Sequence, residues 1–365
     1  MTLLEDAIDG LAKLGPLDGT AMAAARRHFD GLTKPPGSLG RLEDLAVQLA
    51  GITGEPAPTF ARRTVVVAAA DHGIAAHGVS AYSSSVTGQM VANFVAGGAA
   101  ISVLAALVGA DVLVVDAGIA EPLPVATPLP TASDQVRLLS APIRRGTADM
   151  STGPAMTRAE AEAAIDLGLG ISRDLVTTGT GIVAVGEMGI GNTTAASAIV
   201  AVMAGAAVAD VTGTGTGLDD AGRARKVELI ERSLGLNRPD PADPVGVLAA
   251  VGGLEIAVLV GVMLAAAVAR VPVVLDGFIT GAAGLVAAAL CPSLRPRLIA
   301  SHRSPEPGHA IILERLGARP LLDLDLRLGE ATGAAFALGL IDAACALRDG
   351  MATFASAGVS DPTRG

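Results

Sequence analysis

Five short apolar runs, rich in β-branched residues and each followed by a helical stretch, constrain the fold of this chain more than any other feature. The runs do not alternate between apolar and polar residues, which is typical of strands buried on both faces of a parallel sheet. Alternation of such strands with helices predicts a doubly wound α/β fold. The runs lie at 64–73, 111–118, 181–189, 271–278 and 297–304, with a possible sixth strand at 319–330.

Each of the five runs ends in polar residues. In open α/β sheets, ligands bind beyond the carboxyl ends of the strands. One polar residue at a strand end is ordinary, but acids or histidines at five strand ends are better explained by one shared site. The residues concerned are Asp71, His72, Asp116, Glu187, Asp276, Ser301 and His302.

Charge and composition argue against a nucleic-acid partner. The chain has 26 Lys and Arg residues against 36 Asp and Glu residues, and the resulting net charge of −10 repels phosphate backbones. Aromatic residues make up 2% of the chain and tryptophan is absent, so base-stacking platforms are lacking as well.

A membrane location is also not expected, although 51% of the residues are hydrophobic. The most apolar window, 245–269, is made mainly of Ala, Gly and Val and has Glu255 in its middle. A carboxylate at that position costs about 2.5–3.5 kcal/mol on insertion, which small residues barely offset. Two isolated cysteines, Cys291 and Cys345, and an acidic N-terminus without an export signal predict a cytoplasmic protein.

The stretch 184–202 contains an acid beside a glycine-spaced turn. Gly189 and Gly191 allow positive φ and close approach of a ligand to the backbone, and Asn192 and Thr193 lie where they can cap the following helix. Such a helix start is suited to a phosphate or carboxylate. Neither GxGxxG nor GxxxxGK[ST] fits, so the turn predicts an anion site without naming a nucleotide.

Two further stretches carry candidate residues. In 212–230, Gly213, Gly215 and Thr216 precede a helix that contains Lys226, which is either a solvated helix lysine or a cation directed at the same ligand. Glu330 stands before a long apolar helix, where it is either a first-turn acid favoured by the helix dipole or a general base.

Metal and covalent chemistry have weak support. Aspartates and histidines are dispersed, and neither HExxH, HxH nor a Cys/His cluster occurs. A GxSxG elbow is absent as well. We therefore expect no metal and no cofactor.

Taken together, these motifs resemble one family closely. The segments KPPGSLGRLEDLA, ADHGIAAHGVS, VTGQMV, GEMGIGNTT, TGTGTGLDD, DGFITGAAGL, SHRSPEPGH and RLGEATGA occur in the order found in nicotinate-nucleotide:dimethylbenzimidazole phosphoribosyltransferases, from about residue 34 to 347. The resemblance implies a transfer of ribose phosphate from nicotinate mononucleotide to dimethylbenzimidazole. The products are α-ribazole phosphate and nicotinate, and the pathway is the assembly of the lower ligand of cobalamin.

The resemblance also implies residue roles. Glu330 corresponds to the family's base, which takes a proton from the benzimidazole as its other nitrogen attacks C1′ with inversion. Glu187 corresponds to the second acid, which orients the ribose or supports the cation-like transition state, and Lys226 corresponds to a lysine that holds a charged group of the nucleotide. The substrate-binding residues are expected to be Gln89, Met188, Gly189, Gly191, Asn192, Thr193, Gly213, Gly215, Thr216, Ser304 and Leu328, with Gln89, Met188 and Leu328 at the benzimidazole.

The domain organisation follows from the same resemblance. It implies a Rossmann-like domain over 61–330, and a small helical domain built from 1–60 and 331–365. Family members are homodimers in which the partner closes the site.

Three other functions stay open at this stage. A dehydrogenase would use a dinucleotide, and the missing GxGxxG counts against it. A metal-dependent phosphohydrolase would use the dispersed Asp and His residues. A nucleotide-binding module without activity would keep the glycine turns and tolerate loss of Glu330.

Overall fold

The protein is built around one parallel β-sheet in a computed structural model that describes residues 2–123 and 135–360. Within these residues the six strands are hydrogen-bonded in the order β3-β2-β1-β4-β5-β6, and every neighbouring pair is parallel. This order confirms the predicted doubly wound α/β fold. The strands are β1 (Arg63–Ala70), β2 (Asp111–Gly118), β3 (Val136–Ser140), β4 (Ile182–Met188), β5 (Val273–Leu275) and β6 (Leu298–Ala300).

All five predicted runs contain a strand, but the predicted sixth strand at 319–330 is wrong. Only Leu322 in this segment makes a bridge, to His302, and Asp325 has a φ of 55°, which a strand does not accommodate. The sixth strand is β3, at the edge of the sheet. Its residues are mostly exposed and Arg137 interrupts its apolar pattern, so it lacks the buried-strand signature of the other five.

Successive residues of the strands point to opposite faces, and both faces are buried. On β1, Val66 and Ala68 pack in one hydrophobic core, whereas Val65 and Val67 pack in the other. This two-sided burial explains why the runs do not alternate in polarity.

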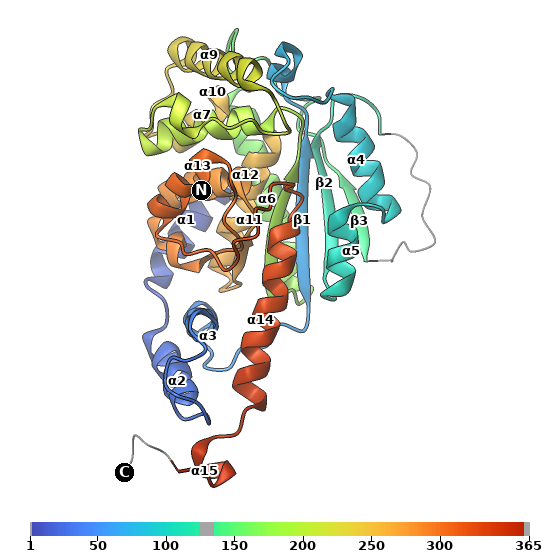
Figure 1. Cartoon of the computed structure of the whole chain (residues 1–365). Coiled ribbons are helices and arrows are strands. Elements are labelled where there is room, and N and C mark those ends of the chain that lie inside the picture. Colours follow the sequence, from blue (N-terminus) through green and yellow to red (C-terminus); the bar gives the residue numbers. More distant parts are fainter. Residues whose placement is uncertain (1, 124–134, 361–365) are drawn as a thin grey trace.

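Helices cover the two faces as separate layers (Figure 1). The first core is formed with α1 (Leu3–Leu14), α6 (Arg158–Thr177), α7 (Asn192–Ala204), α10 (Pro244–Val251), α11 (Leu254–Val268), α12 (Phe278–Leu290) and α13 (Pro307–Leu316). The second core is formed with α2 (Gly19–Asp30), α3 (Arg41–Thr53), α4 (Ser85–Ala96), α5 (Ala100–Leu107) and α14 (Thr332–Gly350). The remaining helices are η1 (Gly73–His77), α8 (Val208–Val211), α9 (Asp220–Asn237), η2 (Pro292–Arg297) and α15 (Phe354–Ala357).

The apolar window 245–269 forms α10 and α11 in the first core. Gly168 of α6 and Gly261 of α11 lie in close contact, since a Cβ at Gly261 would meet the carbonyl oxygen of Ile165. The small residues of this window therefore serve close helix packing. By length and composition alone, Ser85–Leu107 is apolar enough to cross a membrane, but this stretch is divided into α4 and α5, both of which pack on the sheet.

Segments from the two ends of the chain lie together. His28 Nε2 hydrogen-bonds to the carbonyl oxygen of Arg348 at 2.7 Å, and Leu32 pairs with Thr353 in an antiparallel bridge. The first half of α14 packs against β4 and β5, where it adjoins the strand ends. The ends of the two predicted terminal segments, residue 1 and residues 361–365, lie outside the described residues.

Candidate active site

A cavity of about 100 Å³ lies beyond the carboxyl ends of β4, β5 and β6. This position is next to the switch point between β1 and β4, where the sheet order reverses. Predicted residues that line the cavity are Glu187, Met188, Gly189, Asn192, Thr193, Gly215, Thr216, Ser304 and Leu328. A larger cavity of about 510 Å³, between α3, η2 and α13, contains none of the predicted site residues.

The turn after β4 requires its glycines. Gly191 has a φ of 98° and is the N-cap of α7, and a Cβ at Gly189 would stand 2.5 Å from the carbonyl oxygen of Ala70. The expectation that Asn192 and Thr193 cap the helix is wrong, because both lie inside its first turn. The side-chain amide of Asn192 instead donates to Oε2 of Glu187.

Glu187 is buried with only 5% of its surface exposed. Burial and the nearby charges of Asp276, Glu255 and Glu330 raise its pKa well above the usual range, and the hydrogen bond from Asn192 opposes this only partly. The surroundings of Glu187 therefore favour its protonated form, which can donate a hydrogen bond to a ligand.

The two glycine-rich stretches meet at Lys226. Its ammonium, completely buried on α9, donates to Oγ1 of Thr193 at 2.7 Å, and a Cβ at Gly215 would stand 3.4 Å from Nζ. Burial lowers the pKa of Lys226 to about 8, against the opposing charge of Glu306. The interpretation of Lys226 as a solvated helix lysine is therefore wrong.

A carboxylate of the protein itself lies on the second glycine-rich stretch. The backbone N–H of Gly215 donates to Oε1 of Glu306 at 3.1 Å, and a Cβ at Gly213 would collide with Oε2. Backbone donors, an absent Cβ and the nearby ammonium of Lys226 form an anion-binding surface. In this structure the Glu306 side chain is the anion on it.

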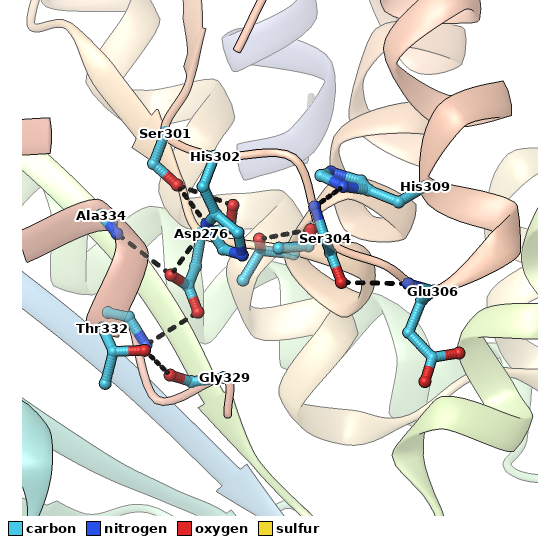
Figure 2. Close-up of polar contacts among 12 residues, drawn as sticks. Asp276, Ser301, His302, Ser304, Glu306, His309, Gly329, Thr332 and Ala334 are labelled. Atoms are coloured by element: carbon cyan, nitrogen blue, oxygen red, sulfur yellow. Dashed lines mark hydrogen bonds and ion pairs between the residues drawn. The ribbon is translucent and has the colours of Figure 1, made fainter. Parts of the chain in front are cut away.

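Ser304 is held by a neutral histidine. Its N–H donates to Nδ1 of His309 at 2.8 Å, and its Oγ accepts from the N–H of Glu306 at 3.4 Å (Figure 2). Burial and the charges of His302 and Arg303 lower the pKa of His309 to about 3, so its ring nitrogen is free to accept at neutral pH.

Glu330 precedes α14 with 5% of its surface exposed. Its Oε2 is buried and has no hydrogen-bond partner among the described residues. Burial first, and the charge of Asp276 second, raise the pKa of Glu330 to about 7. A carboxyl group with this pKa and a free oxygen is suited to accept a proton near neutral pH.

Gln89 does not line this cavity. It lines a separate cavity of about 220 Å³, together with other residues of α4 and residues 119–122. Thr216, which lines the main cavity, has its Oγ1 2.9 Å from Oγ of Ser80 in the segment before α4.

The shared site predicted from five strand ends is wrong in part. Asp116, at the end of β2, accepts from the N–H groups of Gly118 and Ile119 and from the hydroxyl of Ser140. It therefore fixes its own loop. Asp71 lines the smaller cavity with Gln89, so the strand ends of β1 and β2 contribute mainly to that side.

Two buried or partly buried acids near the site, Glu306 and Glu255, are not predicted from the sequence as site residues. Glu306 is noted only as part of a family motif, and Glu255 only as an acid that makes membrane insertion costly. Nε2 of His72 and Oε1 of Glu255 lie 2.8 Å apart, both buried, and a Cβ at Gly253 or Gly189 would press on this pair. The available signal is an acid in the first turn of an otherwise apolar helix that begins directly after two glycines.

Metal ligation has no support in the described residues, which hold no group of three or more His, Cys, Asp or Glu side chains placed to bind one ion. The site is instead an anion-binding surface next to two protonatable carboxyl groups. This arrangement suits a reaction on an anionic substrate in which one proton is removed.

Comparisons with known proteins agree with this chemistry. A family model described as Phosphoribosyltransferase matches residues 14–359. A nicotinate-nucleotide–dimethylbenzimidazole phosphoribosyltransferase of Roseiflexus sp. (strain RS-1) is 54% identical over 360 residues, which cover 99% of each chain. A relative with the same name from Geobacter metallireducens is 50% identical over 98% of each chain.

The fold agrees as well. The crystal structure of the enzyme with this name from Thermus thermophilus superposes with a TM-score of 0.86 at 45% identity, and the match covers 94% of this chain and 100% of that one. The resemblance seen in the motifs is thereby confirmed over nearly the whole length. The chain belongs to the nicotinate-nucleotide–dimethylbenzimidazole phosphoribosyltransferase family and is an enzyme of phosphoribosyl transfer.

Proposed function

We propose that the protein transfers the phosphoribosyl group of nicotinate mononucleotide to dimethylbenzimidazole with inversion at C1′. The products are α-ribazole phosphate and nicotinate, and the reaction belongs to cobalamin biosynthesis. The observation that carries the proposal is that a base and an anion-binding cation flank one strand-end cavity: Glu330 directly follows the lining residue Gly329, and Lys226 donates to the lining residue Thr193. The names of the relatives point to the same two substrates.

The phosphate of the nucleotide binds where the Glu306 carboxylate now lies. The N–H of Gly215 and the open space at Gly213 receive an anionic oxygen there, and Lys226 supplies a positive charge from behind Thr193. A phosphate is larger and more highly charged than a carboxylate, so it displaces the Glu306 side chain on binding. Both glycine-rich stretches thus contribute to one phosphate site.

The bond to be broken needs little help from an acid. In nicotinate mononucleotide the leaving nitrogen is a pyridinium, which departs as neutral pyridine nitrogen with the bonding electrons. One nitrogen of dimethylbenzimidazole attacks C1′ from the opposite face, and the other loses its proton to Glu330. This accounts for the inversion and for the single free carboxylate that the reaction needs.

Of the two roles considered for Glu187, orientation of the ribose is favoured. Burial and the neighbouring carboxyl groups raise its pKa well above the usual range, which favours a protonated carboxyl group that donates a hydrogen bond to a ribose hydroxyl. The same raised pKa disfavours the negative charge that would support a cation-like transition state. Asn192 holds Oε2 of Glu187 and so fixes the direction of that donor.

The acceptor base lies against Met188 and Leu328, both of which line the main cavity. Gln89, which lines the second cavity on α4, contacts the acceptor from that side in this proposal. With 2% aromatic residues in the chain, an apolar slot of aliphatic side chains holds the flat bicyclic base.

The enzyme acts as a cytoplasmic homodimer. Large apolar side chains are exposed on α5 and α14 and on the edge strand β3: Val103 at 62%, Leu107 at 76%, Phe336 at 40% and Leu138 at 40%. The helices α5 and α14 pack together, and the exposed apolar side chains of these two neighbouring helices are suited to contact with a second copy. Light scattering at micromolar concentration is expected to give twice the mass of the chain, and the double variant Val103→Glu with Leu107→Glu is expected to be monomeric. A wild-type monomer would contradict the dimer.

The decisive test of the reaction compares wild type with Glu330→Gln. Both are mixed with nicotinate mononucleotide and dimethylbenzimidazole, and nicotinate and α-ribazole phosphate are measured by chromatography. Loss of a well-placed general base is expected to lower kcat by about 10²–10⁴-fold. Because the base must be ionised and the pKa of Glu330 is about 7, wild-type kcat/KM is expected to fall as the pH drops below about 7.

Glu228→Gln is the matched control, since Glu228 is an exposed glutamate on α9 away from the cavity. It is expected to leave kcat unchanged. Product formation with an unimpaired Glu330→Gln variant would assign the base elsewhere, with Glu187 next to be tested. Absence of product from folded wild-type protein, with other base acceptors also tried, would refute the transferase.

A further inference from the structure

The backbone that carries Glu330 has an unusual conformation. Gly329, Glu330 and Ala331 have φ values of 83°, 63° and 68°, so three consecutive residues lie in the left-handed region. Two of them have a Cβ, which makes this region costly. Such a segment persists only where its surroundings hold it, and the groups that hold it determine where the Glu330 carboxylate points.

Asp276 accepts two of the hydrogen bonds that fix this segment. Its Oδ2 accepts from the N–H of Ala331 at 3.2 Å, and its Oδ1 accepts from the N–H of Ala334 at 3.0 Å (Figure 2). Ala331 is the N-cap residue of α14, and its methyl side chain has no acceptor for the free N–H groups of the first turn. The carboxylate of Asp276, from the end of β5, takes the place of that missing cap.

Asp276 is itself fixed by the neighbouring strand end. Its side chain is 1% exposed, and the hydroxyl of Ser301 donates to its backbone oxygen at 2.8 Å. Nδ1 of His302 lies 3.9 Å from its Oδ1, and a Cβ at Gly333 would collide with this imidazole. The end of β5, the end of β6 and the start of α14 are therefore packed as one unit.

The same segment is closely packed on its other side. A Cβ at Gly186 of β4 would collide with the backbone nitrogen of Ala331, and Thr332 Oγ1 donates to the carbonyl oxygen of Gly329 at 2.8 Å. Displacement of residues 329–331 would therefore move the Glu330 carboxylate relative to the cavity.

We propose that Asp276 is a positioning residue for this reaction, which fixes residues 329–331 through the N-terminus of α14 so that Glu330 faces the acceptor. This inference rests on the proposed function, in which Glu330 is the base. Asp276 also acts on Glu330 through its charge, because a buried carboxylate disfavours a second negative charge nearby and raises the pKa of Glu330. Among the described residues, Glu187 from β4 feels the charge of Glu330, His302 after β6 lies beside Asp276, and exposed Arg327 lies in the loop before Glu330.

The test uses Asp276→Asn in the full-length protein. Asparagine keeps the size and one acceptor oxygen, but it loses the charge and the second acceptor. We expect kcat to fall by about 10–100-fold, the cost of a misplaced catalytic group, with the KM for nicotinate mononucleotide changed by less than about 2-fold. The acid limb of the kcat/KM profile is expected to move to lower pH, because removal of a negative charge lowers the pKa of Glu330.

Asp116→Asn is the matched control. Asp116 is also a buried aspartate at a strand end that accepts from backbone N–H groups, but it lies at the end of β2. Its substitution is expected to leave the acid limb at the wild-type pH. A loss of folding alone would not produce this difference between the two variants.

Two further measurements test the same contacts without relying on the pH profile. Hydrogen exchange of a peptide covering residues 329–336 is expected to be faster in Asp276→Asn than in wild type or Asp116→Asn, and this readout needs no substrate. Adding Ala331→Gly to Asp276→Asn is expected to restore part of kcat and of the thermal stability, because glycine adopts a positive φ without strain.

Different results would contradict the proposed transferase function and the positioning role of Asp276. A wild-type enzyme without transferase activity would refute the proposed function, whereas faster exchange in Asp276→Asn would still support the hold on residues 329–331. Unchanged exchange, or an active wild type with an unmoved acid limb and kcat within about 2-fold in the variant, would overturn the role of Asp276.

Discussion

The two halves of the strand-end edge use the same residue types for different purposes. At β2, Asp116 satisfies both carboxylate oxygens with donors of the adjoining loops and β3. At β4–β6, Glu187, Asp276 and Glu330 are buried within reach of one another's charge, and Oε2 of Glu330 has no hydrogen-bond partner in the described part of the chain. An acid at a strand end thus points to chemistry where its oxygen is left free and its pKa is raised.

The two halves of the edge also differ in positive charge. Lys226 is completely buried beside the β4 turn, and its pKa is lowered to about 8. Among the described residues, no carboxylate forms an ion pair with this ammonium, and such a buried charge is costly unless an anionic ligand binds it. We therefore propose that the phosphate binds in the β4–β6 half.

The largest expected effect that sharpens this comparison comes from Lys226→Met. Loss of a charge-assisted hydrogen bond is expected to lower kcat/KM for nicotinate mononucleotide by about 10–100-fold, mainly through KM. Wild-type affinity is expected to weaken as the pH rises through about 8, where Lys226 loses its proton, and the variant is expected to lack this change. Steady-state kinetics between pH 6 and 10 measure both, since about 8 lies inside that window.

Lys13→Met, on the exposed last turn of α1, is the control for the loss of a lysine. It is expected to match wild type at every pH. A folded Lys226→Met variant with the wild-type KM would contradict binding of the phosphate in this half.

A smaller effect is expected from Asp116→Ala, which tests the other half. Two backbone N–H groups and the Ser140 hydroxyl lose their acceptor, so the free energy of unfolding is expected to fall by about 1–3 kcal/mol. Chemical denaturation measures this loss, and kcat per folded molecule at pH 7 is expected to stay at the wild-type value. A drop in kcat comparable to that of Glu330→Gln would break the distinction between the halves.

Much of the fold was predictable because burial leaves a direct mark on sequence. Strands covered on both faces must be continuously apolar, and this rule predicts five of the six strands in the described residues. The edge strand β3 escaped it because its side chains are mostly exposed. The segment 319–330 has the alternating Leu and Asp residues of a strand, but the left-handed backbone of Asp325 is not compatible with one.

For the site, the sequence by itself determined the residue types. These are glycines where a Cβ would collide, a lysine on the helix after the second glycine-rich stretch, and acids at the strand ends. Only the tertiary structure decided which of these act together. It placed Thr193 against Lys226, set Glu306 on the N–H of Gly215, and gave Asp276 rather than Asp116 to the segment that carries Glu330. The reason is that a pKa, a vacant oxygen or an anion site depends on charges and donors a few ångströms away, and these come from segments far apart in the chain.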